Sequence, residues 1–298
     1  MDNLHRIETI TQFNDLRNHE TFYPLVTVID LAESPQKQLG RTYMGLYVIY
    51  LKEKMCGELR YGMRTYDYQE GTLVFIAPGQ VVGVDKPIEN YQPKGYALAF
   101  HPDLIHGTSL GQRIKDYTFF SYDVYEALHL SEQEKLVIVD CLKKIDYESR
   151  HAIDKHSKTL IVSYIELFLN YCVRFYDRQF ITREPENRDI VSRFEKVIDD
   201  YINEGKTREE GLPSVRYCAE QMHLSANYLG DLLRKETGKS AQEHIQQKVI
   251  DIAKERIFEP GKSLSEIAFD LGFKYPQHFT RMFKKSVGYT PSEFKNLN

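Results

Sequence analysis

The sequence has 298 residues, of which 42% are hydrophobic, and its formal net charge at pH 7 is -4. This length accommodates two domains with separate hydrophobic cores. The charge is uneven, because residues 212–298 carry 13 Lys and Arg against 10 Asp and Glu, while residues 1–211 carry 26 against 33. The C-terminal part is therefore the better candidate for contact with a polyanion.

Composition also excludes several classes of protein. The sequence has no run of about 18 apolar residues and no charged-then-apolar N-terminus, which argues against a membrane span and a secretory leader. Cys56, Cys141, Cys172 and Cys218 have no paired spacing, so we expect reduced thiols and a cytoplasmic protein. Motifs of hydrolases, phosphate-binding loops and metalloproteases are missing, and we expect neither an enzyme nor a cofactor.

Short runs of β-forming residues alternate with turn residues in the first hundred positions. They cover residues 25–31, 43–51, 59–65, 71–77, 80–84 and 95–100. The run at 71–77 is the clearest, because turn residues bracket its apolar centre. Such a series of short strands predicts a small antiparallel barrel or sandwich.

Tyrosines are frequent in these predicted strands. They are Tyr43, Tyr47, Tyr50, Tyr61, Tyr66 and Tyr68. Alternate positions of a strand share a face, so several rings would line the interior of a barrel. Aromatic walls with hydroxyl tips can bind a small organic molecule, with Tyr43, Tyr47 and Tyr61 as the candidate residues. Alternatively the tyrosines only fill the core, since aromatic residues are enriched in strands.

Two histidines follow the last predicted strand. His101 and His106 are five residues apart and flank Pro102. A metal site needs three convergent ligands, each oriented by further hydrogen bonds. We therefore expect surface or loop-packing histidines here and no bound metal.

Two helices are predicted after the strands. Ser131 and Glu134 fit a capping box for a helix at 132–147. Its predicted apolar stripe is Leu136, Val139, Leu142 and Ile145. A longer helix at 155–177 is apolar over more than one face, so we expect it to pack against both the barrel and a second surface. Either the helix meets another copy of the chain through Ile165 and Phe168, or it only closes the barrel of a monomer.

Two similar units follow near the C-terminus, each a short helix, a tight turn and a second helix with Arg and Lys. In the second unit, Ser263 and Glu266 fit a capping box at the start of the first helix. Gly272 suits a helix end with positive φ, and Pro276 suits the first turn of the next helix.

The second helix of this unit, at 277–285, has an inward face made of Phe279, Met282 and Phe283. Its outward residues are Gln277, His278, Arg281, Lys284 and Lys285. Gln and Arg can make two hydrogen bonds to adenine and guanine edges, and Lys suits phosphate. The pattern predicts a helix that reads DNA.

The first unit follows the same plan, with Ser214 and Ser225 as N-caps. The candidate DNA contacts of its second helix are Asn227, Tyr228, Asp231, Arg234 and Lys235. Gly230 weakens this helix by about 1 kcal/mol relative to Ala, and Asp231 repels phosphate unless it accepts from cytosine. We therefore expect the helix at 277–285 to dominate base readout.

These motifs together resemble the signature of AraC-type transcription regulators. The matching residues are Ile267-Ala268, Leu271-Gly272-Phe273, Phe279, Arg281, Phe283-Lys284, Gly288 and Thr290-Pro291, in the order and spacing of the family. The resemblance covers residues 190–298 and implies seven helices, of which two enter successive major grooves. A linker helix at 242–257, about 24 Å long, would hold these two apart. Operator DNA and RNA polymerase are the implied partners.

In front of such a domain, the predicted strands resemble the cupin-type sensor of many AraC-like regulators. The expected chain is therefore α+β and multidomain. Its parts are a cupin-like β domain at 1–130, a helical dimerisation segment at 131–181, a linker at 182–192 and an all-α double helix-turn-helix domain at 193–298.

The leading functional hypothesis is a homodimeric transcription regulator that senses a small-molecule effector such as a sugar or metabolite. The alternative is a DNA-binding regulator whose β domain only dimerises or docks a partner protein. A cupin enzyme with a DNA-binding tail is disfavoured, because the His-x-His pattern of a cupin metal site is missing.

Overall fold

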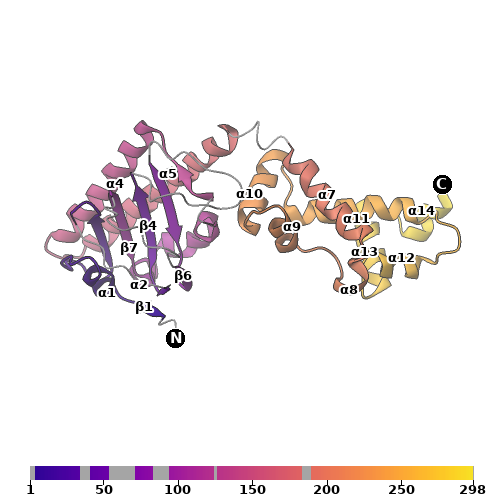
Figure 1. The fold of residues 1–298 in the computed structure, drawn as a ribbon, viewed down its shortest axis with the longest axis horizontal. Helices are drawn as coiled ribbons and strands as arrows, with labels where there is room; N and C mark the ends of the chain where they lie inside the picture. The colour runs from indigo at the N-terminus through magenta and orange to yellow at the C-terminus, as the bar shows by residue number, and fades with distance from the viewer. Residues whose placement is uncertain are drawn as a thin grey trace. The chain divides into compact units, whose positions relative to one another are not determined.

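The computed structural model describes residues 4–33, 41–53, 71–82, 94–123, 126–182 and 189–297. The chain divides into two compact units, Met1–Thr182 and Arg183–Asn298, each with buried residues of its own (Figure 1). The fold is mixed α and β, and every strand of the described residues belongs to the first unit. None of the described helices is long and apolar enough to cross a membrane.

Two sheets organise the first unit. The larger has the order β2-β7-β4-β5-β8 and is antiparallel. Its strands are β2 (Val26–Asp30), β4 (Tyr47–Lys52), β5 (Thr72–Ile76), β7 (Gly95–Phe100) and β8 (Leu128–His129). The smaller sheet has the order β1-β3-β6, with β1 (His5–Ile7), β3 (Thr42–Met44) and β6 (Gln80–Val82). Its pair β1 and β3 is parallel.

Neither sheet closes on itself within the described residues, so the predicted cupin-like barrel is not confirmed. The strand predicted at 43–51 is divided into β3 and β4. Between them Gly45 donates its N–H to the carbonyl of Ile7, which keeps β3 in the smaller sheet while β4 joins the larger one. The strand predicted at 59–65 lies outside the described residues, together with Tyr61, Tyr66 and Tyr68.

One buried cluster joins the two sheets and the short helix α1 (Ile10–Asp15). Its members are Ile7, Ile10, Phe13, Ile29, Leu31, Met44, Leu46, Val48, Ile76, Ala97 and Ala99. Side chains alternate between the faces of a strand, so the larger sheet has an inner face towards this cluster and an opposite face. Tyr50 packs against the cluster, whereas Tyr47 lies on the opposite face.

Two long helices, α4 (Glu132–Arg150) and α5 (Ser157–Thr182), pack against each other and against the larger sheet (Figure 1). The predicted capping box of Ser131 and Glu134 is present at the start of α4. The buried apolar residues of α4 are Ile138, Cys141, Leu142 and Ile145. The placement of Leu136 in this stripe was wrong, since Leu136 is 67% exposed. It precedes Ile138 by two positions, about 200° around the helix.

Helix α5 is buried along the side predicted to meet another copy. Ile165 and Phe168 are 0% exposed within the chain itself, so their assignment to a dimer surface was wrong. This side already packs in the core of the unit beside α4. The apolar residues that α5 exposes are Leu160, Leu167 and Val173.

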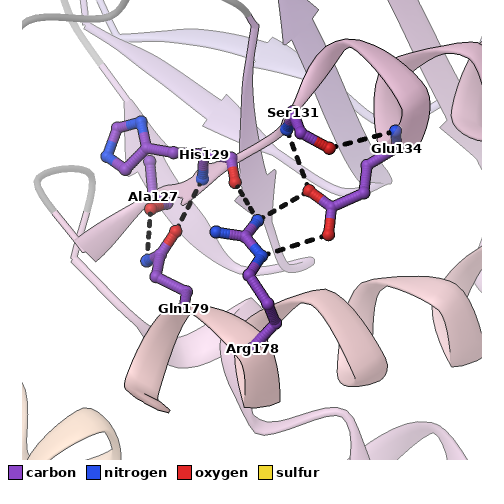
Figure 2. Close-up of polar contacts among 6 residues, drawn as sticks. All are labelled: Ala127, His129, Ser131, Glu134, Arg178 and Gln179. Atoms are coloured by element: carbon purple, nitrogen blue, oxygen red, sulfur yellow. Dashed lines mark hydrogen bonds and ion pairs between the residues drawn. The ribbon is translucent and has the colours of Figure 1, made fainter. Parts of the chain in front are cut away.

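The last turns of α5 are fastened to β8 and to the start of α4 (Figure 2). Arg178 donates from Nε and Nη2 to the two carboxylate oxygens of Glu134, at 3.1 and 2.7 Å, and Nη2 also donates to the His129 carbonyl at 2.6 Å. Gln179 accepts from the His129 N–H at 2.8 Å and donates to the Ala127 carbonyl at 3.2 Å. One guanidinium therefore joins a strand, a helix cap and the end of α5.

The second unit consists of helices. They are α7 (Ile190–Asn203), α8 (Thr207–Glu210), α9 (Val215–Gln221), α10 (Ala226–Thr237), α11 (Ala241–Arg256), α12 (Leu264–Asp270), α13 (Pro276–Val287) and α14 (Pro291–Leu297). The described residues thus contain the seven implied helices and, in addition, the short α8. The predicted N-caps Ser214, Ser225 and Ser263 are confirmed, since each side chain accepts a backbone N–H of the following helix.

Candidate nucleic-acid interface

Helix α13 has a buried face and an exposed polar face. Phe279 and Phe283 are buried, and Met282 is half-buried. Every residue that the sequence placed outward is exposed, namely Gln277, His278, Arg281, Lys284 and Lys285. The helix starts with Pro276 in its first turn and ends at Gly288 in the left-handed conformation, so both ends of the exposed face are fixed by local chemistry.

The turn before α13 adds an aromatic residue that the sequence analysis missed. Tyr275 is 59% exposed, and its ring lies edge-on to the ring of His278 at 5.5 Å. A single aromatic residue in a turn has no periodic signal, so only its position beside His278 marks it. The exposed face of α13 therefore continues into the turn.

Helix α10 presents a smaller polar face. Asn227, Arg234 and Lys235 are exposed and Asp231 is half-buried. The outward placement of Tyr228 was wrong, since its side chain is 5% exposed. Tyr228 precedes the buried Leu232 by four residues, and residues four apart share one face of a helix.

The cations on α13 differ from several others in this unit. Arg281, Lys284 and Lys285 make no ion pair with any residue that the structure describes. By contrast, carboxylates hold Arg208, Lys248 and Lys262. The charges on the exposed face of α13 are therefore available to an external anion such as a phosphate.

A clasp around Asp270 joins α8, which precedes the first helix-turn-helix unit, to α12 of the second. Its carboxylate accepts from Arg208 Nε at 3.0 Å and from Lys262 Nζ at 3.1 Å, and its carbonyl accepts from the Thr207 hydroxyl at 2.6 Å. Burial alone would raise the pKa of Asp270, but the hydrogen bond from Lys262 and the charge of Arg208 outweigh burial and lower it. The carboxylate thus stays ionised and holds α8 against the end of α12.

Close backbone approach at Gly272 tightens the same junction. Gly272 has φ of 91°, and a Cβ there would lie 2.7 Å from the carbonyl carbon of Gly211. Only glycine fits both the left-handed conformation and this approach. Helix α11, 16 residues long, contacts α7, α9, α10 and α13 and so spans about 24 Å between the units at about 1.5 Å per residue.

Two of the three predicted effector residues, Tyr43 and Tyr47, are described, and they have separate surroundings, whereas Tyr61 lies outside the described residues. Tyr43 lies under the Arg6 guanidinium, 4.3 Å from its ring centre. Tyr47 stacks on Phe100 at 4.9 Å and meets Phe120 edge-on at 5.1 Å, on the face of the sheet opposite to the buried cluster. The contacts of Tyr47 are those of aromatic packing, whereas Tyr43 is half-buried under an exposed arginine. Of the described tyrosines in these predicted strands, Tyr50 packs against the buried cluster of the inner face.

The histidines after β7 have a local role. His101 caps α2 (Pro102–Ile105), since its Nδ1 accepts the Asp103 N–H at 3.2 Å. Over the ranges that the structure describes, His, Cys, Asp and Glu do not gather in a group of three or more that could hold a metal ion.

Comparison with known proteins gives a family match in the second unit. Residues 218–296 match a family model described as a helix-turn-helix domain. The chain is 24% identical over 245 residues to the uncharacterized HTH-type transcriptional regulator YfiF of Bacillus subtilis, covering 77% of this chain and 73% of YfiF. It is 35% identical over 109 residues to the transcriptional regulatory protein YesN of the same organism, and these cover 36% of this chain but 28% of YesN.

Among solved structures, apo ToxT from Vibrio cholerae aligns over 91% of this chain and 96% of its own, with 14% identity and a TM-score of 0.30.

Proposed function

This chain belongs to the AraC-type transcription regulators, and from that premise we propose that α10 and α13 read specific operator DNA. The exposed face of α13 is the observation that carries the proposal. It combines Gln277 and Arg281, which suit base edges, with Lys284 and Lys285, which suit phosphates. Helix α11, which contacts both α10 and α13, supports it, and so does the Asp270 clasp, which holds α8 to α12, because two reading helices need a fixed separation to reach successive grooves about 34 Å apart.

The contributions of the two helices differ in this proposal. Helix α13 dominates base readout. Helix α10 contributes Asn227, Arg234 and Lys235, with Asp231 as a possible acceptor for cytosine and the buried Tyr228 left out.

Substitutions on α13 test the reading face. Arg281→Ala should weaken specific binding by about 1–3 kcal/mol and relax base preference at one operator position, because an Arg that makes two hydrogen bonds to guanine carries that much discrimination. Lys284→Ala should weaken binding to all sequences alike and reduce the salt slope by about one unit. The measurement is a titration of a base-substituted operator series at several salt concentrations.

Lys295→Ala is the matched control, since Lys295 is exposed on α14 and lies outside the proposed face. It removes the same charge and should change neither base preference nor the salt slope. Unchanged base preference in Arg281→Ala would show that α13 is assigned the wrong reading face.

The first unit, as proposed, binds a small-molecule effector and passes its presence to DNA binding. Its inner face, with Tyr50, supports this role better than Tyr43 or Tyr47 does. The alternative, a cupin-like unit that only dimerises or docks a protein, is favoured by the close packing of Tyr47. A true effector must change operator affinity, and operator DNA must then change effector affinity by the same factor.

The proposed regulator acts in the cytoplasm as a homodimer and contacts RNA polymerase. Four residues of α5 support dimerisation, since Leu160, Tyr164, Leu167 and Tyr171 recur at alternating spacings of four and three and are exposed or half-buried. That spacing is typical of helices that pack against a partner helix.

A further inference from the structure

A buried arginine in the first unit has no counter-ion among the residues that the structure describes. Arg17 follows α1 and is 5% exposed. Its Nη1 is buried without a hydrogen-bond partner, and its guanidinium makes no ion pair with any carboxylate of the described ranges. A guanidinium cannot discard its proton at physiological pH, so burial without a partner is strongly unfavourable. The natural remedy is an anion from outside the chain.

Tyr50 lies beside Arg17, whose guanidinium acts on the Tyr50 hydroxyl both as a charge and as a hydrogen-bond donor. Burial raises the pKa of Tyr50, while the charge of Arg17 and its hydrogen bonding to the hydroxyl act in the opposite direction. The net pKa is above the ordinary value, so the hydroxyl keeps its hydrogen and can donate it. Arg17 and Tyr50 therefore offer N–H and O–H donors to one acceptor group.

The neighbours of Tyr50 do not supply that acceptor. In the larger sheet Tyr50 is in register with Ala97 on one side and Val74 on the other, and both side chains are apolar. Leu16, beside Arg17, packs against the apolar cluster. A ligand here would meet two donors at one end and hydrocarbon around the rest.

A second polar atom nearby also lacks a partner. Asn14 is 0% exposed and donates from Nδ2 to the Thr21 hydroxyl at 2.9 Å, but its Oδ1 is unpartnered. Asn14 and Arg17 are linked through the backbone, since the Arg17 N–H donates to the Asn14 carbonyl at 2.9 Å. The Asn14 Oδ1 is an acceptor and would not bind an anion, so the unpartnered donor at Arg17 is the group that points to an anionic ligand.

We propose that Arg17 and Tyr50 bind the carboxylate group of a small organic ligand on the inner face of the first unit. The planar guanidinium can donate two parallel N–H bonds to the two carboxylate oxygens, and the Tyr50 O–H donates to one of them. The chemical class of the ligand is thus an organic monocarboxylate. That this ligand regulates DNA binding rests on the proposed function.

Thermal denaturation of the full chain tests the site. The probes are sodium acetate, butyrate, octanoate and benzoate, each compared with its primary amide and with sodium chloride at equal ionic strength. At least one carboxylate should raise the melting temperature in a saturable way, and its neutral amide should not. Arg17→Met should abolish the shift, whereas Arg174→Met, which removes an exposed guanidinium of α5, should preserve it. An equal effect of chloride, or no effect of any carboxylate, overturns the proposal.

The melting temperatures of the Arg17 variants without any ligand provide a second test of the site. Since Met removes an unpaired buried charge, Arg17→Met without ligand should melt at the wild-type temperature or above it. A clearly lower melting temperature would make Arg17 a structural residue and contradict the site. Arg17→Lys keeps the charge but loses the planar pair of donors, so its affinity for the active carboxylate should fall tenfold or more.

Operator titrations separate the two proposals. A carboxylate that stabilises the wild type but leaves operator affinity unchanged supports the site and refutes its regulatory role. A chain that binds no operator sequence specifically, with or without the carboxylate, refutes the proposed function and leaves the site standing.

Discussion

Thr237, at the end of α10, and His244 of α11 are hydrogen-bonded to each other. The hydrogen bonds around them determine which nitrogen of the His244 ring carries a proton. The Thr237 hydroxyl donates to the Leu233 carbonyl at 2.7 Å and accepts from the Lys239 N–H at 3.1 Å. His244 Nε2, 2.7 Å from the same oxygen, must therefore be the donor in this contact. Burial and the charge of Lys239 lower the pKa of His244 below 6.5, so the neutral ring is favoured in the folded protein.

This lowered pKa predicts a pH dependence of the second unit. The unfolded chain binds the His244 proton more readily than the folded one, so the contribution to stability is complete above about pH 6.5 and is lost as the pH falls through the folded pKa. Hydrogen exchange of the α10 and α11 amides, followed between about pH 7 and 5, measures it. His244→Gln, which can still donate to Thr237, should lose less protection on acidification.

His19 provides the control for that experiment. Its pKa is also lowered, mainly by burial, but it lies in the first unit. His19→Gln should leave the pH dependence of α10 and α11 as in the wild type. Equal acid sensitivity of His244→Gln and the wild type would contradict the assignment.

The environment of some single residues could be predicted from the sequence and that of others could not. The caps at Ser131, Ser225 and Ser263 were predictable, because each signal lies within four residues of chain. Tyr228 was not, since a tyrosine on a polar helix suits either face and only the packing around Leu232 decides. Arg17 gave no signal, because its isolation depends on neighbours that are distant in sequence.

At the scale of elements, the second unit uses glycine at two helix ends for two different reasons. Gly272 and Gly288 have nearly the same positive φ, 91° and 89°. A Cβ at Gly288 would meet no atom within 4 Å, whereas one at Gly272 would collide with the backbone of Gly211. Gly288 must be glycine only for its backbone conformation, whereas Gly272 must be glycine for its conformation and also for space.

Replacing the two glycines by alanine should cost different amounts of stability. Gly288→Ala should cost about 1–2 kcal/mol, the usual penalty for a left-handed residue with a side chain. Gly272→Ala should cost more, since the α8–α12 junction must also separate. Chemical denaturation of the two variants gives the comparison, and operator affinity should fall more for Gly272→Ala. Equal costs would show that the junction adapts without strain.

Elements were predicted best where their signals are local. The ranges of α10 and α13 follow from caps, periodicity and glycine ends, that of α11 was implied by the family resemblance, and β7 at 95–100 follows from its composition. The parallel pairing of β1 with β3 and the Asp270 clasp were not predictable, because they join segments separated by more than thirty residues. The sequence indicated an enclosed β domain, but register between distant strands decides closure.

At the scale of the whole molecule, the proposed dimer depends on one side of α5. Leu167 lies in the exposed stripe with Leu160, Tyr164 and Tyr171, whereas Val173 is similarly exposed on another side of the helix. Leu167→Glu should lower dimer affinity at least tenfold without unfolding the protein, since the side chain is 43% exposed in the single chain. Sedimentation with parallel thermal melts is the measurement.

Val173→Glu is the matched control and should leave the dimer intact. A wild-type protein that stays monomeric at high micromolar concentration, or equal effects of the two substitutions, would exclude this interface. Ile165→Glu should unfold the first unit instead, because Ile165 is wholly buried.

The Asp270 clasp has a consequence for the nucleic acid itself. The clasp holds α12 to α8, and α11 contacts both α10 and α13, so the two reading helices have little freedom to adjust their separation and the double helix must accommodate any mismatch by bending or changing twist. The energy of that distortion depends on the base steps between the two contacted stretches, where no side chain reads a base. Flexible pyrimidine–purine steps in this spacer should therefore favour binding, and part of the sequence preference would come from the mechanics of uncontacted DNA.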